Sequence, residues 1–332
     1  MNRIAILGTG GMGTALALLF AARGKSVRLW ARSPEQASRL ASDRENRRHL
    51  PGVRLPDLVE ITHDAGLACG EADLIVAAIP SAFLRATLES IADRVPGGTP
   101  MLSVIKGIET STFARPSRIL VETLGDREAA ILSGPGHAEE LARGLPASMV
   151  VAGTSESLCV AIRDALSGDA LRLYTNRDPV GVELAGALKN VLGIAAGICE
   201  GLGFGDNAKA ALLTRGLVEM ARFGTALGGD PSTFQGLAGI GDVITTCYSP
   251  YGRNRAVGRA VGEGRSLAEV LGGMVNVAEG VPTCRSLYHL SRAEGVEMPI
   301  SDEVHRILFE GKSPRSAVAA LMLRDPKGER ST

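Results

Sequence analysis

The first turn of the chain constrains its fold more than any other feature. Residues 4–7 are apolar and typical of a buried strand, and residues 15–22 form an apolar run typical of a helix. Between them lie Gly8, Gly10 and Gly13, in the spacing G-x-G-x-x-G. In a dinucleotide site these glycines permit a tight turn, bring backbone close to a pyrophosphate and let the helix pack on the strand. A plain glycine-rich turn is the alternative, since the chain has 41 glycines, but the position between strand and helix favours a nucleotide site.

Length and composition bound the class of protein. A chain of 332 residues exceeds one ordinary core, so two domains are expected. The 36 Lys and Arg residues balance 36 Asp and Glu residues, which indicates no nucleic-acid partner, and the basic segment 44–48 is too short to change that.

The cysteines and the apolar runs bear on location. The 5 cysteines show no C-x-x-C spacing, so we expect reduced thiols, no metal site and a cytoplasmic protein. Residues 1–3 lead directly into the first strand, and Glu200 interrupts the longest apolar run. We therefore expect neither a signal peptide nor membrane insertion.

The residues after the second predicted strand indicate the cofactor. Residues 26–30 complete a strand–helix–strand unit, after which an NAD-preferring site usually has an acidic residue for the ribose hydroxyl. Here Arg32 stands in that region, and no carboxylate follows until Glu35. A guanidinium can pair with a 2′-phosphate, so NADP(H) is favoured and NAD(H) is possible. The alternative is a solvated arginine at the end of a strand.

Residues 35–70 are polar and are expected to be helical or loop-like. They contain the basic residues Arg44, Arg47 and Arg48 close to Pro51 and Pro56. This segment is either a lid over the cofactor or an exposed excursion, and the sequence leaves both possibilities open.

Continuous apolar runs predict the rest of a sheet. Runs without alternation indicate strands that are buried on both faces, as in a parallel sheet covered by helices. The runs are residues 72–79, 101–105 and 129–132. Residues 147–152 and 171–174 are expected to form two more strands, which flank a helix at 156–166.

Three of these strands end at residues that are suited to a ligand site. They are followed by Pro80, by Lys106 and by Gly134. Ligands of such sheets bind outside the carboxyl ends of the strands. We therefore expect Lys106 and Gly134 at the same edge as the glycine-rich turn.

The composition changes near residue 178. Asp178 is a suitable N-cap and Pro179 a suitable first residue for a helix. Only helical patterns follow. The predicted fold is α/β, with a Rossmann-like, doubly wound, mostly parallel sheet over residues 1–178 and an all-helical substrate and catalytic domain over residues 179–332.

The first helix of this second half contains Lys189 on a stripe of glycines. Gly186, Gly193 and Gly197 share its face of the helix, although each costs about 1 kcal/mol relative to alanine. Either another backbone or a ligand must approach there. A partly desolvated lysine can have a lowered pKa and act as a general acid or base; the alternative is a lysine that passes a packing stripe.

Two further clusters are candidates for a site. Asp242 lies in an apolar and small environment within residues 239–246. Arg253, Asn254 and Arg255 could form a phosphate cradle, because guanidinium groups offer bidentate donors. A surface charge cluster explains the second pattern equally well.

Taken together, these motifs resemble the NAD(P)-dependent glycerol-3-phosphate dehydrogenase family, bacterial type, over nearly the whole chain. The ordered set is far more specific than any single motif. The matching segments are residues 8–15, 106–107, 133–135, 182–191, 203–216, 239–242, 253–255 and 277–280.

The resemblance implies hydride transfer between NAD(P)H and dihydroxyacetone phosphate, which gives sn-glycerol 3-phosphate for phospholipid synthesis. It implies that Lys189 donates and accepts the proton at the C2 oxygen, with Lys106 and Asp242 as polar partners. The substrate is a phosphorylated small molecule, and we expect a homodimer. The implied substrate-binding residues are Lys106, Gly134, Gly136, Asp242, Thr246, Gly252, Arg253 and Asn254. The implied cofactor-binding residues are Gly8, Gly10, Gly11, Met12, Gly13, Arg32, Lys106, Ala138, Arg253, Val277 and Glu279.

Two positions depart from the family pattern. Gly136 stands where bacterial members usually have Ser or Thr, and Gly252 where they often have Ser. Each change removes a hydroxyl near the expected substrate, so backbone N–H groups or water would have to replace it.

Two rival functions remain. A related enzyme acting on a 3-hydroxy acid or ketopantoate would need no phosphate cradle, so residues 253–255 count against it. A nucleotide-sensing binding protein without catalysis would be expected to lose the catalytic lysine, yet Lys106, Lys189 and Asp242 are all present.

Overall fold

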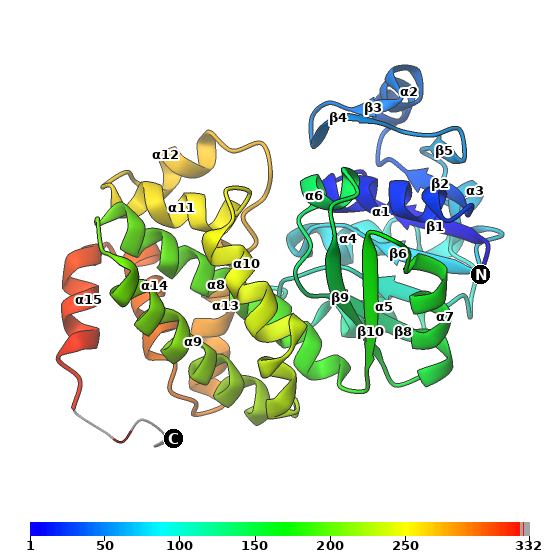
Figure 1. Ribbon diagram of the computed structural model, residues 1–332. Coiled ribbons are helices and arrows are strands. Elements are labelled where there is room, and N and C mark those ends of the chain that lie inside the picture. The colour runs from blue at the N-terminus through cyan, green and yellow to red at the C-terminus, as the bar shows by residue number, and fades with distance from the viewer. Residues whose placement is uncertain (326–327, 329–332) are drawn as a thin grey trace. The chain divides into compact units, whose positions relative to one another are not determined.

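The computed structural model describes residues 1–325 and 328 (Figure 1). The chain divides into two compact units. Unit 1 comprises Met1–Lys106 and Ala114–Glu183, and unit 2 comprises Gly107–Phe113 and Leu184–Thr332. No pattern in the sequence indicated that residues 107–113 group with the helical unit. The limits of the domains at 178 and 179 stay a prediction.

Unit 1 is built on one large sheet. Among the described residues, eight strands pair in the order β10-β9-β8-β7-β6-β1-β2-β5. Every neighbouring pair is parallel except β8 and β9, which are antiparallel. This confirms the mostly parallel sheet. The strands are β1 Arg3–Leu7, β2 Ser26–Trp30, β5 Val59–Thr62, β6 Leu74–Ala77, β7 Met101–Ser103, β8 Ala129–Ser133, β9 Ala147–Gly153 and β10 Leu171–Asn176.

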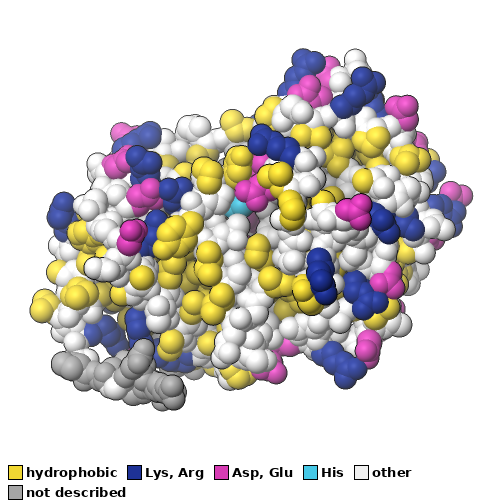
Figure 2. All heavy atoms as spheres, in the orientation of Figure 1, with side chains coloured by type: hydrophobic (Ala, Val, Ile, Leu, Met, Phe, Trp, Pro, Cys, Tyr) yellow, Lys and Arg dark blue, Asp and Glu magenta, His cyan; other side chains and the backbone are white. Residues whose placement is uncertain are grey.

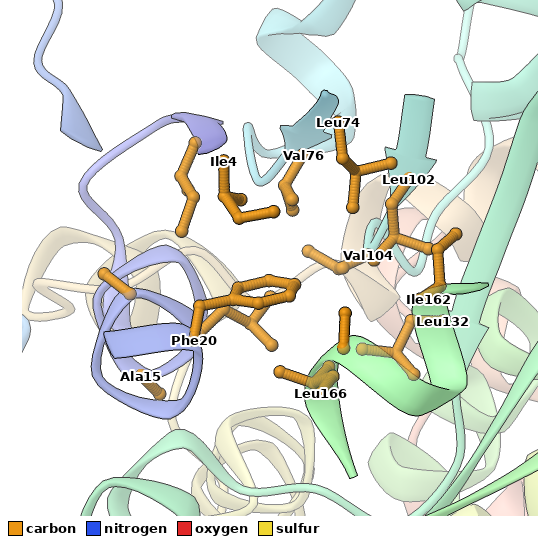
Figure 3. Close-up of a cluster of buried hydrophobic side chains, with 14 of the residues drawn as sticks. Ile4, Ala15, Phe20, Leu74, Val76, Leu102, Val104, Leu132, Ile162 and Leu166 are labelled. Carbon is orange, nitrogen blue, oxygen red and sulfur yellow. The ribbon is translucent and has the colours of Figure 1, made fainter. Parts of the chain in front are cut away.

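Helices cover both faces of this sheet. Successive side chains of a strand point to opposite faces, so Ile4 and Ile6 of β1 join one hydrophobic core and Ala5 and Leu7 join another. In the first core, the ring of Phe20 lies among strand side chains (Figure 3). The helices of unit 1 are α1 Gly11–Ala22, α2 Pro34–Asp43, α3 Ala65–Cys69, α4 Leu84–Glu89, α5 Pro116–Leu124, α6 Ala138–Ala142 and α7 Glu156–Leu166.

The segment 35–70 differs from the prediction of helix or loop alone. It contains the hairpin β3 Glu45–Asn46 and β4 Leu50–Arg54, and then the edge strand β5. Leu50 and Leu55 are buried in the first core, so the segment is not an exposed excursion. The sequence did not reveal β5 because an edge strand of four residues, partly exposed, presents no continuous apolar run.

Arg44 closes the base of this hairpin. Its Nε donates to Leu55 O at 3.3 Å and its Nη1 to Val59 O at 3.0 Å. Arg47 pairs with two carboxylates, Asp43 at 3.8 Å and Glu45 at 3.5 Å. Figure 2 shows basic and acidic side chains together over this region at the upper right, so the basic segment is partly neutralised by its own neighbours.

Unit 2 is helical. From residue 178 to residue 325 the structure contains helices and turns and no strand, as predicted. The helices are α8 Pro179–Gly201, α9 Asp206–Ala226, α10 Asp242–Tyr248, α11 Arg253–Gly262, α12 Leu267–Gly272, α13 Gly280–Ala293, α14 Pro299–Phe309 and α15 Pro314–Met322, with a π-helical turn at Leu237–Gly241.

Helix α8 is the central helix for the site. Its first turn is capped by Asp178, whose Oδ1 accepts from Gly181 N at 2.8 Å, as the sequence predicts. The helix is long and apolar enough to cross a membrane, but its most apolar window is 100% buried within the protein. This burial is typical of a core helix.

The glycine stripe of α8 accommodates another backbone. A Cβ atom on Gly197 would lie 2.1 Å from Arg255 O, and one on Gly258 of α11 would lie 2.0 Å from Ile194 O. At Gly193 the nearest atom would be Thr246 Cγ2, at 2.7 Å. The stripe therefore brings α10 and α11 against α8, which decides in favour of close packing over a ligand at these positions.

Candidate active site

The glycine-rich turn of unit 1 has the geometry of a phosphate site. Gly8 has a φ of +116°, which favours glycine, and a Cβ on Gly13 would lie 2.1 Å from Gly8 O. At Gly10, no heavy atom of the described chain lies within 4 Å of a Cβ position. Helix α1 begins at Gly11, so its unpaired N–H groups stand beside this open space. These residues fit a pyrophosphate.

Two distant segments flank the first turn of α1. A Cβ on Gly11 would lie 3.2 Å from His49 O, after the β3 strand, and 3.4 Å from Ala138 Cβ, at the start of α6. Met12 packs against the first hydrophobic core. The structure thus brings together the predicted cofactor residues Gly8, Gly10, Gly11, Gly13 and Ala138.

Arg32 follows β2 and is exposed to solvent. Within residues 1–325 and 328, its guanidinium has no hydrogen-bond or ion-pair partner. The side chain is therefore able to meet a phosphate group, and its role stays a prediction.

Lys106 and Gly134 meet at the carboxyl edge of the sheet. Lys106 Nζ donates to Gly134 O at 2.9 Å, which joins the segments that follow β7 and β8. A Cβ on Gly136 would lie 2.8 Å from Met149 Sδ. The Met149 side chain therefore occupies the space that the family's Ser or Thr would need.

In unit 2, Lys189 is held by two residues of α10. Its Nζ lies 3.1 Å from Asp242 Oδ1 and also donates to Thr246 Oγ1. Lys189, Asp242 and Thr246 are 7%, 2% and 2% exposed. A buried ammonium needs such partners, and the arrangement presents a proton donor in a water-poor environment.

The adjacent cysteine is not a nucleophile. Burial raises the pKa of the Cys247 thiol to about 12. It therefore stays protonated at neutral pH.

Asn254 joins three helices of unit 2. Its Nδ2 donates to Asn190 Oδ1 of α8 at 2.9 Å, and its Oδ1 accepts from Gly280 N of α13 at 2.9 Å. The preceding residue Arg253 is exposed, and its Nη1 donates to Val277 O at 2.9 Å. The structure thus brings Arg253 and Asn254 to the segment that contains Val277 and Glu279.

Arg255 does not belong to a phosphate cradle, contrary to the cradle pattern in the sequence. Its Nε and Nη2 donate to the two carboxylate oxygens of Glu200 at 2.8 and 2.6 Å, and its Nη1 donates to Ser249 O at 3.0 Å. A Cβ on Gly252 would lie 2.7 Å from Thr246 O. The family's Ser at this position would therefore require a shift of backbone.

Sequence reasoning missed the polar residues that support the site. Glu183, 2% exposed, accepts from Arg115 Nη1 and from Ser117 N, both at 2.7 Å, and so caps α5. Asn46 is hydrogen-bonded to the glycine-rich turn. The only sequence signal for the role of Glu183 was its position within an otherwise apolar helix. No sequence signal indicated the role of Asn46.

Comparisons with known proteins agree over both halves of the chain. Residues 3–159 match the family model for the NAD-dependent glycerol-3-phosphate dehydrogenase N-terminus, and residues 178–319 match that for the C-terminus. A protein of Chlorobium limicola named glycerol-3-phosphate dehydrogenase [NAD(P)+] is 48% identical over 98% of this chain and 99% of its own length. One of Moorella thermoacetica with the same name is 47% identical over 97% of this chain and 96% of its own.

A solved structure is similar as well. The crystal structure of glycerol-3-phosphate dehydrogenase from Coxiella burnetii has a TM-score of 0.94 and 35% identity, and the match covers 97% of this chain and 99% of that one. Both the sequence and the fold therefore match over nearly the whole chain. The chain belongs to the NAD-dependent glycerol-3-phosphate dehydrogenase family.

Proposed function

We propose that this protein is an NAD(P)-dependent sn-glycerol-3-phosphate dehydrogenase, which interconverts dihydroxyacetone phosphate and sn-glycerol 3-phosphate. The observation that carries the proposal is the buried Lys189 ammonium, 3.1 Å from Asp242 Oδ1 and bonded to Thr246. Reduction of a ketone needs a proton at the oxygen as well as a hydride at the carbon. Lys189 supplies that proton within a family whose members carry this activity in their names.

The residues of unit 1 bind the cofactor, which supplies or accepts the hydride when bound. The N–H groups at the start of α1 receive the pyrophosphate beside Gly10, where the structure is open. Lys106 and Ala138 flank this edge.

The residues of unit 2 move the proton and hold the substrate. Lys189 Nζ gives a proton to the C2 oxygen in the reductive direction and takes it back in the oxidative direction. Asp242 orients the ammonium and stabilises its charge. Arg253 binds the substrate phosphate. Its side chain is exposed, and within the described chain only its Nη1 is hydrogen-bonded. Asn254, the next residue of α11, supports Arg253 through its bond to Asn190.

NADPH is preferred over NADH, which the unpartnered, exposed Arg32 supports. The enzyme is cytoplasmic and supplies glycerol 3-phosphate for phospholipid synthesis. The enzyme is a homodimer. An exposed apolar row on α10 and the turn before it supports this oligomeric state. The row consists of Ile240, Ile244 and Tyr248.

The test is oxidation of NADPH by the purified protein, followed by the cofactor's absorbance. Turnover is expected with dihydroxyacetone phosphate, slow turnover with dihydroxyacetone, which lacks the phosphate, and none with ketopantoate. Turnover of ketopantoate alone would favour the rival enzyme. Binding of NADPH without turnover of any substrate would favour a nucleotide-binding protein.

A further inference from the structure

A buried asparagine connects the β3–β4 hairpin to the glycine-rich turn. Asn46, 3% exposed, donates from Nδ2 to Thr9 O at 2.8 Å and to Thr14 Oγ1 at 2.8 Å. Its Oδ1 accepts from His49 N at 3.2 Å. Both hydrogens of the amide nitrogen are used, and both bonds reach across more than 30 residues of sequence, with separations of 37 and 32.

The hairpin is also held by contacts that do not involve Asn46. Arg44 ties its base to the backbone of Leu55 and Val59, and Leu50 and Leu55 are buried in the first core. The hairpin is therefore fixed by other contacts. The Nδ2 group of Asn46 acts instead on the turn that it faces.

The turn needs such an anchor. The peptide between Thr9 and Gly10 lies next to Gly8 and Gly10, whose backbones have wide conformational freedom. Because the peptide is planar and trans, the direction of Thr9 C=O determines the direction of Gly10 N–H. Asn46 holds that carbonyl, and it also holds Thr14 in the first turns of α1.

We infer that Asn46 is a positioning residue for the dinucleotide cofactor, which keeps the glycine-rich turn in its phosphate-binding shape through Thr9 and Thr14. The inference rests on the proposed cofactor role of this turn. Without the anchor, the turn samples other peptide orientations, and the apparent affinity for cofactor falls by the fraction of chains that remain competent to bind.

The experiment measures the dissociation constant for NADPH by calorimetry on the full-length chain. Asn46→Asp keeps the acceptor for His49 N and removes both donors, and Thr14→Val removes one acceptor with little change of shape. Arg47→Ala is the matched control, because Arg47 lies on the same hairpin and makes only exposed ion pairs. Thermal unfolding establishes that each variant is folded.

Asn46→Asp is expected to raise the Kd for NADPH about 10- to 100-fold, and Thr14→Val by less. Arg47→Ala is expected to change it by less than about 2-fold. In steady state the KM for NADPH rises with the Kd, whereas kcat at saturating NADPH and the KM for dihydroxyacetone phosphate stay unchanged. A merely structural role of Asn46 would instead lower thermal stability without raising the KM for NADPH selectively.

An unchanged Kd in a folded Asn46→Asp variant overturns the inference. Should that variant not fold, Thr14→Val decides, since an unchanged Kd there overturns it equally. A wild-type protein that binds neither NADPH nor NADH would overturn the cofactor role of the turn, and with it the proposed function. If the wild type and both variants bind NADPH equally tightly, the role of Asn46 is overturned and the proposed function is unaffected.

Discussion

At the scale of single residues, the ammonium of Lys189 is bracketed by two oxygens of α10. Lys189→Ala should lower kcat about 10²- to 10⁴-fold, because a general acid contributes that much in the transition state. The Kd for NADPH should not change. Stopped-flow and steady-state rates with dihydroxyacetone phosphate measure the effect, and Lys25→Ala, at an exposed contact with Asn2 in unit 1, serves as control. A variant that keeps more than about a tenth of wild-type kcat would make Lys189 a packing residue.

Two neighbouring arginines have different roles, and substitution can separate them. Arg253→Ala should remove a charge-assisted pair worth about 1.5–3 kcal/mol, which lowers kcat/KM for dihydroxyacetone phosphate about 10- to 150-fold. Arg253→Lys should recover part of it, since a point charge does not reproduce two parallel hydrogen bonds. Dihydroxyacetone should be a poor substrate that neither change affects.

Arg255→Ala is the comparison for Arg253, because Arg255 is bonded to Glu200. It should lower thermal stability, and its effect on kcat/KM should not depend on the substrate's phosphate. If Arg253→Ala weakens both substrates equally, the phosphate is bound elsewhere.

The expected preference for NADPH over NADH depends on Arg32. Arg32→Ala should lower the ratio of kcat/KM for NADPH to that for NADH about 10-fold, because the exposed guanidinium would pair with the 2′-phosphate. The KM for dihydroxyacetone phosphate should stay constant as the internal control. A wild-type preference for NADH that the substitution leaves unmoved contradicts the proposal.

At the scale of elements, α8, which contains Lys189, packs closely on α11, which begins at Arg253. A Cβ on Gly258 would lie 2.0 Å from Ile194 O, a backbone atom of α8. Gly258→Ala should therefore cost about 1–3 kcal/mol of stability or more. Gly272→Ala is the matched control, because no described atom lies within 4 Å of its Cβ position. Urea unfolding measures both, and equal stability of the two variants would show that α11 can shift freely.

The elements that sequence predicts well are those with a strong local pattern. The strands β7 and β8 are continuous apolar runs, and α8 begins with a recognisable cap at Asp178. The hairpin β3–β4 has no such pattern, since its position depends on the bonds of Arg44 to the backbone of Leu55 and Val59 and on the burial of Leu50 and Leu55.

The contacts of the site residues are likewise not visible in local sequence patterns. The sequence could not distinguish Arg253 from Arg255, because the partner of Arg255, Glu200, lies 55 residues away. Likewise, nothing local indicated that Met149 occupies the space beside Gly136. Local propensity is readable from sequence, and long-range polar contacts are not.

At the scale of the whole molecule, the pH dependence of stability depends on a buried carboxyl of α9. Glu219 accepts hydrogen bonds from Ile300 N at 2.8 Å, Ser301 N at 2.9 Å and Ser301 Oγ at 2.6 Å, and so caps the first turn of α14. It is 3% exposed. Burial, assisted by the nearby Asp302, outweighs these three donors and raises the pKa of Glu219 to about 7.

A carboxyl whose pKa is raised on folding favours the folded state when protonated. Its contribution is fully present below the pKa of the unfolded chain, near 4.5, and is lost as the pH rises through about 7. The loss amounts to at most about 3.4 kcal/mol. The amide side chain of the Glu219→Gln variant cannot ionise, so the unfolding free energy of this variant should lack this pH-dependent contribution. Any cost of the amide itself is the same at every pH. The unfolding free energy of wild type minus that of Glu219→Gln should therefore fall as the pH rises from about 4.5 to about 7. Urea titrations followed by circular dichroism measure this difference. A difference that rises with pH would mean that the three donors outweigh burial and that Glu219 caps α14 as a carboxylate.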